Sequence, residues 1–196
     1  MKITFRFLVA LTLFTLFSCA ETTLTISSKD QRQFAEFPDG STAFLNKNSS
    51  ITYTETFEKR SVKQTGEVFY SVKKGAVPFV ITTEMGEVRV LGTEFNVKAN
   101  KDGLEVEVEK GSVELRVHKL VKKIKKGQRA LFKEVDASFK IGKAEFQHKK
   151  WVRLLQKDLK KLEKEINKGT KKIGKEAKKI GETLQSKFKS LKKKHE

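Results

Sequence analysis

Short stretches in which apolar and polar residues alternate dominate the middle of the chain. The clearest spans 104–109, where Leu and Val alternate strictly with Glu, and 113–117 repeats the pattern after a Lys-Gly pair. A period of two with one apolar face predicts half-buried β-strands. Such stretches recur about every 8 to 12 residues with Gly between them, which leaves no room for crossover helices. The pattern predicts a mainly β domain over 33–135, solenoid-like or sandwich-like.

Eleven strands are expected in this region. They span 42–46, 50–53, 61–64, 67–72, 77–82, 87–91, 93–99, 104–109, 113–117, 122–126 and 130–132. A Thr65-Gly66 pair is expected to separate the third from the fourth.

The period changes after Glu145. Apolar residues then lie three and four positions apart at 152, 155, 159, 162 and 166, and the series resumes after Gly169. This spacing predicts an amphipathic helix over 145–196. Three glycines in this stretch each cost about 1 kcal/mol of helix stability relative to Ala, so the helix on its own would be marginal.

The N-terminal residues are typical of an export signal. Lys2 and Arg6 precede an apolar run too short to span a bilayer, which needs about 20 residues. We expect 1–18 to be a lipoprotein signal peptide and Cys19, the single cysteine, to become the lipidated N-terminus. The Thr- and Ser-rich segment 19–32 is expected to be a tether.

The positive charge of the chain is concentrated at its C-terminal end. The net charge is +18, and residues 145–196 carry 18 Lys and Arg against 7 Asp and Glu. The β domain and the basic tail therefore need separate functional explanations.

Several turn motifs follow one another in a specific order. They are Phe37-Pro38-Asp39-Gly40-Ser41, Leu45-Asn46, Gly66-Glu67-Val68-Phe69, Pro78-Phe79-Val80 and Leu91-Gly92-Thr93-Glu94-Phe95. This order resembles the extracytoplasmic domain of the FecR family of transmembrane regulators. The resemblance implies a non-catalytic binding or sensing domain, which in the family connects an outer-membrane transporter to a cytoplasmic sigma factor. The expected signal peptide stands in place of the family's sigma-binding and transmembrane segments, so direct sigma-factor antagonism is not expected.

The motif residues are expected to be structural. Turn glycines are expected at Gly40, Gly66, Gly92, Gly111 and Gly127. Core aromatic residues are expected at Phe69, Phe79 and Phe95, and short polar side chains that bond to nearby backbone at Asp39, Asn46, Glu67 and Asn96.

No pattern points to an enzyme, a metal site or a cofactor. The three histidines, His118, His148 and His195, lie in different kinds of segment, and no nucleophile or phosphate-loop motif is present. Glu105, Glu107, Glu109 and Glu114 are expected on the solvent face of a hairpin.

The expected function is that of a bacterial cell-envelope lipoprotein, periplasmic or surface-facing and held to the membrane through Cys19. Its β domain would bind or scaffold, and its tail would dock on an anionic lipid, lipopolysaccharide or an acidic cell-wall polymer. A partner helix, self-association and a solvated tail remain alternatives, whereas export argues against nucleic acid. The competing hypothesis is a signalling component that acts through another envelope protein.

Overall fold

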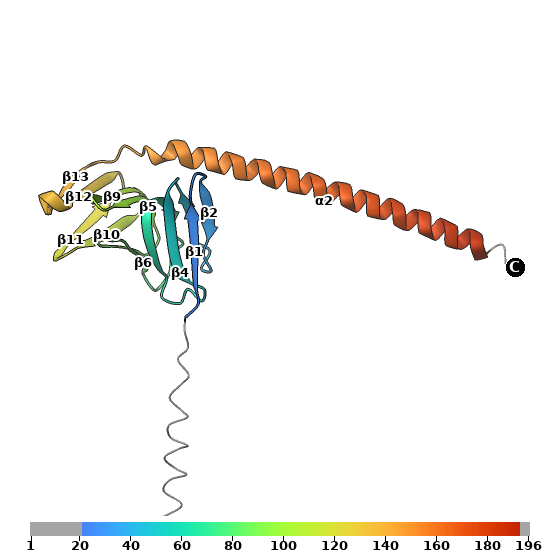
Figure 1. Ribbon diagram of the computed structural model, residues 1–196, viewed down its shortest axis with the longest axis horizontal. Helices are drawn as coiled ribbons and strands as arrows, with labels where there is room; N and C mark the ends of the chain where they lie inside the picture. The colour runs from blue at the N-terminus through green and yellow to red at the C-terminus, as the bar shows by residue number, and fades with distance from the viewer. Residues whose placement is uncertain (1–20, 193–196) are drawn as a thin grey trace, which may run out of the picture. The chain divides into compact units, whose positions relative to one another are not determined.

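A computed structural model describes residues 21–192, with side chains described up to 171 and at 173–175 and 178. The chain divides into a β unit that ends at Phe146 and a helical unit that begins at Gln147. The expected signal peptide and Cys19 lie outside the described residues. The mainly β prediction with a C-terminal helix is confirmed (Figure 1).

Thirteen strands form the described part of the β unit. They are β1 (Thr23–Ser28), β2 (Gln33–Glu36), β3 (Thr42–Leu45), β4 (Ser49–Thr54), β5 (Ser61–Ser71), β6 (Phe79–Thr82), β7 (Glu87–Val90), β8 (Glu94–Asn100), β9 (Gly103–Lys110), β10 (Ser112–Val117), β11 (Leu120–Lys125), β12 (Gln128–Lys133) and β13 (Ser138–Lys143). A short 3-10 helix, η2 (Glu134–Asp136), precedes β13.

One curled sheet contains all of these strands. Nine of them follow the order β11-β10-β7-β6-β5-β8-β9-β12-β13, and β1 to β4 branch from this path. The long central strand β5 is shared by both halves of the sheet. Its first half pairs with β4 and, in parallel, with β6, whereas its second half pairs with β3 and β8. In Figure 1, β5 lies in the middle of the β unit, and the inward residues of both halves form one core, as in a sandwich.

Gly66 lets β5 pass from one half of the sheet to the other. Its φ is +79°, and a Cβ there would lie 2.7 Å from both Asn48 O and Ser49 Cα. The close approach arises because Ser49 Oγ bonds to both the backbone N–H and the carbonyl of Glu67. The break expected at Thr65-Gly66 is therefore wrong: the glycine bends a single strand instead of ending one.

The core is built from the inward residues of both halves. Tyr70, Phe79, Phe95 and Phe132 are its largest fully buried members. Phe79 contacts three other rings, with centroid distances of 5.4 Å to Phe37, 5.6 Å to Phe57 and 5.9 Å to Tyr70. Phe79 and Phe95 are core residues as expected.

Phe69 is buried, but it lies outside this main cluster. Its neighbours Val68 and Tyr70 point into the core, so the alternation of β5 turns Phe69 to the opposite face. There its ring lies 6.3 Å from that of Phe44.

Two boundaries expected from the sequence are wrong. Residues 23–28 of the expected tether form β1, which pairs along its whole length with β4. At the other end, β13 pairs with β12 and extends the domain beyond 135. Both additions are edge strands that complete a ladder. Each carries a short alternation of only two apolar residues, Leu24 and Ile26 in β1 and Phe139 and Ile141 in β13.

The expectation that Glu107 lies on the solvent face of a hairpin is wrong. It is only 4% exposed, and its Oε1 accepts hydrogen bonds from the backbone N–H groups of Glu145 and Phe146. Phe146 has a φ of +54°, which a helix does not allow. Helix α2 (His148–Lys192) therefore begins three residues later than expected.

Helix α2 confirms the long helix that the period of the tail predicts. Gly169 and Gly174 lie within it, and a Cβ at either would meet open space. Among the described helices, we find none that combines the length and the apolar character needed to cross a membrane.

Tyr70 supplies a test of the core. Its hydroxyl donates to Gln64 Oε1 at 3.0 Å, and burial raises its pKa well above the ordinary value of 10.0. Below pH 10 the phenol is neutral in both states, so its contribution to stability is complete there. As pH rises further the unfolded state loses the proton first, and the free energy of unfolding falls.

We expect denaturant titrations to show this alkaline loss, and we expect it to be smaller in Tyr70→Phe. The absorbance of tyrosinate in the folded protein measures the ionisation of its two tyrosines. If both of them ionised near pH 10, the argument that burial raises the pKa of Tyr70 would be contradicted.

Candidate binding site

A groove runs over the outer surface of β7, β10 and β11. Its volume is about 510 Å³. The lining residues are Pro78, Arg89, Val90, Leu91, Gly92, Thr93, Gly111, Ser112, Glu114, Arg116 and Lys123. Leu91 is 52% exposed, so the groove has an apolar end near Pro78 and a charged end over the strands.

The charged end is an alternating array on two antiparallel strands. Glu87 and Arg89 belong to β7, and Glu114 and Arg116 to β10, so each arginine lies opposite the glutamate of the other strand. Each arginine also bonds to the glutamate of its own strand, with Nε–Oε distances of 3.3 Å in β7 and 2.6 Å in β10. Lys123 of β11 lies opposite Glu114 and leaves one excess positive charge.

The Nη edges of the two arginines make no hydrogen bond within the described part of the chain. A guanidinium whose Nε side is already oriented presents this edge to a carboxylate or phosphate. The groove can therefore bind a small ligand or a peptide segment that combines an apolar group with an anionic one.

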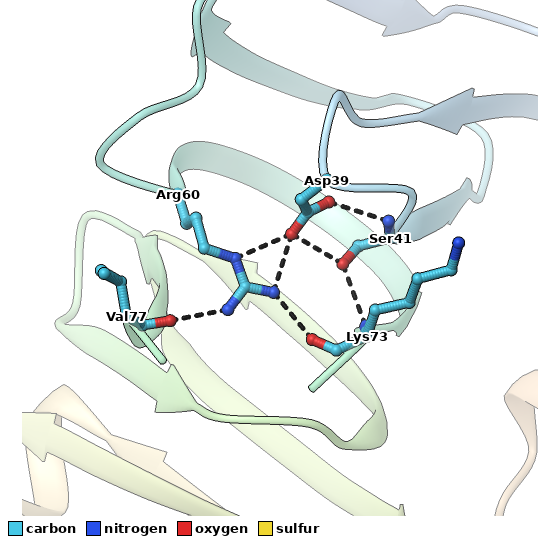
Figure 2. Close-up of polar contacts among 5 residues, drawn as sticks. All are labelled: Asp39, Ser41, Arg60, Lys73 and Val77. Carbon is cyan, nitrogen blue, oxygen red and sulfur yellow. Dashed lines mark hydrogen bonds and ion pairs between the residues drawn. The ribbon is translucent and has the colours of Figure 1, made fainter. Parts of the chain in front are cut away.

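A buried ion pair anchors the loop that leads into Pro78 at the edge of the groove. Arg60 bonds to Asp39 Oδ2 through Nε at 2.8 Å and through Nη2 at 2.7 Å (Figure 2). The same guanidinium donates from Nη1 to the carbonyl of Val77 at 2.6 Å and from Nη2 to that of Lys73 at 2.7 Å. Arg60 thereby fixes both ends of the loop that leads into Pro78.

Asp39 and Gly75 fit closely around this arginine. Asp39 also accepts hydrogen bonds from the backbone N–H and the hydroxyl of Ser41, as expected for a turn aspartate. A Cβ at Gly75 would lie 2.2 Å from Arg60 Nη1, so only glycine leaves room for the side chain. The turn motif in the sequence explains the bonds from Asp39 to Ser41. It does not indicate the ion pair with Arg60, because no local pattern marks that residue.

Asn46, Glu67 and Asn96 form a second polar cluster. The two carboxylate oxygens of Glu67 accept from Asn46 Nδ2 at 2.7 Å and from Asn96 Nδ2 at 3.1 Å. Arg32 Nε donates to Asn46 Oδ1 at 3.1 Å. The expectation that these side chains bond to nearby backbone is wrong, because β3, β5 and β8 bring them together across the sheet.

Of the other candidate residues, Gly92 and Gly111 line the groove, and the rest do not converge on a site. Gly40, Gly66, Gly111 and Gly127 have positive φ, and a Cβ at Gly92 would lie 2.9 Å from Lys74 Cα. His118 lies 3.5 Å from Glu134 on the surface, and His195 falls outside the described residues. In the part of the chain that the structure describes, no three His, Cys, Asp or Glu side chains are grouped as a metal site requires.

The comparisons with known proteins agree with this geometry. Residues 23–114 match the family model described as FecR protein. Two crystal structures of a "putative anti-sigma factor" from Parabacteroides distasonis ATCC 8503 are similar to the chain, each with 25% identity. They cover 64% and 63% of the chain with TM-scores of 0.61 and 0.60. No curated protein matches.

Residues 23–114 thus match a FecR domain, and the chain spans 62% and 61% of the two solved structures. The groove residues from Pro78 to Glu114 fall inside the matched region. The match fits a periplasmic or envelope location.

Proposed function

We propose that this protein is a cell-envelope lipoprotein in which the FecR domain binds or scaffolds and α2 docks on an anionic surface. The FecR match over 23–114 is the observation that supports the binding or scaffolding role. The export signal and Cys19 in the sequence support the anchor. The concentration of basic residues in the tail supports the docking, since each Lys near an anionic membrane contributes about 1 kcal/mol.

The groove beside Pro78 is the place where the domain would take its ligand. It lies on paired strands of the sheet, and the buried pair between Asp39 and Arg60 anchors the loop that leads into Pro78 at its edge. Preorganisation of this kind lowers the entropic cost of binding.

A second candidate is a component of envelope signal transduction. The two solved structures favour it, because both are described as anti-sigma factors. In this alternative the FecR domain receives a cue in the envelope and passes it to another protein.

The anchor is tested by mass spectrometry of the mature N-terminus and by membrane fractionation. We expect a chain that begins at Cys19 with a diacyl or triacyl mass, and we expect Cys19→Ala to lack it. A mature chain that still begins at Met1 would contradict the lipoprotein proposal.

The same fractionation, applied to a chain without 145–196, tests the tail. We expect the acylated deletion variant to stay in the membrane fraction through its lipid but to release more readily than the full chain at low salt. High salt should remove the difference, because it screens the charges of the tail. Recovery of a defined envelope protein with the β unit, unaffected by the deletion, would favour the signalling alternative.

A further inference from the structure

Helix α2 carries an exposed apolar stripe along one side. With 3.6 residues per turn, successive residues are about 100° apart around the axis, which places the apolar residues within about 60° of one another. The stripe consists of Leu155, Leu159, Leu162, Ile166 and Ile173. Leu162, Ile166 and Ile173 are 55%, 66% and 69% exposed.

The basic residues occupy the opposite side of the helix. Their positions centre about 180° from the stripe. We call this set the basic face: Arg153, Lys157, Lys160, Lys161, Lys164, Lys168, Lys171, Lys175 and Lys178, all of them exposed. The first five of these, with Gln156, line one shallow hollow of about 450 Å³.

The acidic residues lie between the two sides. Asp158, Glu163 and Glu165 fall about 70° to 90° from the centre of the stripe, at its borders. Within the described part of the chain, no acidic side chain forms an ion pair with the basic face. Its charges are therefore available to an external anion.

This order of charges does not suit a helix that lies in a bilayer. When an apolar stripe enters the acyl region, the residues at its borders stand at the level of the lipid phosphates. Cations there would extend toward the phosphates, but α2 places carboxylates at that level and turns its lysines away. Anionic lipid would thus repel the carboxylates at the borders of the stripe, and the lysines of the basic face would lie too far from the phosphates to attract them strongly.

The basic face instead suits an extended ligand. From Arg153 to Lys178 the axis advances about 38 Å at 1.5 Å per residue, with one cation for roughly every 4 to 5 Å. Eight of the nine cations are Lys, which act as point charges and do not provide the planar fork by which Arg recognises phosphate. Such a row recognises charges in series along a polymer more than the geometry of one group.

We propose that the basic face of α2 binds a linear acidic polysaccharide laid along the helix axis. The inference rests on the proposed function, because it specifies the anionic surface on which the tail docks. The driving force is the release of counterions from both polyions, so the affinity falls steeply with salt.

The experiment uses residues 21–196 without an acyl group, which keeps both described units, and polygalacturonate as the probe. The test variant replaces four lysines of the basic face: Lys157→Gln, Lys160→Gln, Lys164→Gln and Lys168→Gln. The matched control removes the same charge from exposed lysines of the β unit that do not line the groove: Lys119→Gln, Lys122→Gln, Lys125→Gln and Lys126→Gln. Gln and Lys have similar helix propensities, so circular dichroism should show an intact helix.

We expect the basic-face variant to bind polygalacturonate about 600-fold more weakly, since each of the four Lys beside a polyanion contributes about five-fold. The affinity of the β-unit control for polygalacturonate should fall by less than about five-fold. Leu162→Ser with Ile166→Ser should leave the affinity within about three-fold, and Arg in place of the four lysines should restore it.

Each of three results would overturn the inference. Equal losses in the basic-face variant and the β-unit control would show that net charge alone decides. Binding to phosphatidylglycerol vesicles or polyphosphate, with none to polygalacturonate, would name another anion and leave the docking proposal standing. Binding to none of these probes would remove both the inference and the docking proposal.

Discussion

Replacing Arg60 with Ala is expected to lower the free energy of unfolding by about 3 to 5 kcal/mol, because one partner of a buried, hydrogen-bonded ion pair is removed. Arg60 is 8% exposed, and its guanidinium bonds to Asp39 and to the carbonyls of Lys73 and Val77. The substitution leaves a carboxylate and two carbonyls without this donor. Chemical denaturation monitored by near-ultraviolet circular dichroism, to which the buried rings of Tyr70 and Phe79 in the β unit contribute, measures the change.

Arg89→Ala is the matched control. Arg89 pairs with Glu87 at 3.3 Å, but both side chains are more than a third exposed, so the loss should stay below about 1 kcal/mol. Arg60→Lys keeps the charge but cannot reach all three partners at once, and it should recover only part of the stability. Equal effects of Arg60→Ala and Arg89→Ala would show that the buried pair does not hold the loop.

The Arg60 result also bears on the groove. The loop from Lys73 to Val77 leads directly into Pro78, which lines the groove. Hydrogen exchange of the loop amides in Arg60→Ala should rise before global unfolding, as expected for a segment that has lost its local anchors.

Gly66→Ala is expected to destabilise the fold by about 2 to 5 kcal/mol. A left-handed φ costs a residue with a Cβ about 1 to 2 kcal/mol, and crowding adds about 1 to 3 kcal/mol. The crowding is with backbone, since the Cβ would lie 2.7 Å from Asn48 O and Ser49 Cα. Relief would require β4 and β5 to separate at the point where the two halves of the sheet meet.

Gly127 provides the comparison for Gly66. Its φ of +80° is nearly the same as the +79° of Gly66, but nothing lies within 4 Å of an added Cβ. Gly127→Ala should therefore cost only the backbone term of about 1 to 2 kcal/mol. Equal losses from the two substitutions in thermal or denaturant unfolding would refute the close approach of β4 to β5.

Strong local periodicity predicted much of the fold. The alternation at 104–109 and 113–117 appears as β9 and β10, and the spacing of three and four after 145 appears as α2. Shorter alternations were missed. In β1 and β13 only two apolar residues alternate with polar ones, and pairing with β4 and β12 makes each of them a strand.

The candidate site was predictable only in part. The motif order around Pro78 and Gly92 indicated a FecR-type domain, which the match over 23–114 bears out. Neither the groove nor the partners of Asp39 and Glu67 followed from it, because their contacts join residues 21 or more positions apart.

By itself, the sequence determined the class of fold, the domain family and the amphipathic tail, since each depends on the order of neighbouring residues along the chain. Only the tertiary structure decided that Arg60 is buried, that Glu107 is hidden and that β5 serves both halves of the sheet. These features depend on which strands lie side by side. The free energy of a buried charge or a close backbone contact is set by those distant neighbours and not by the local pattern.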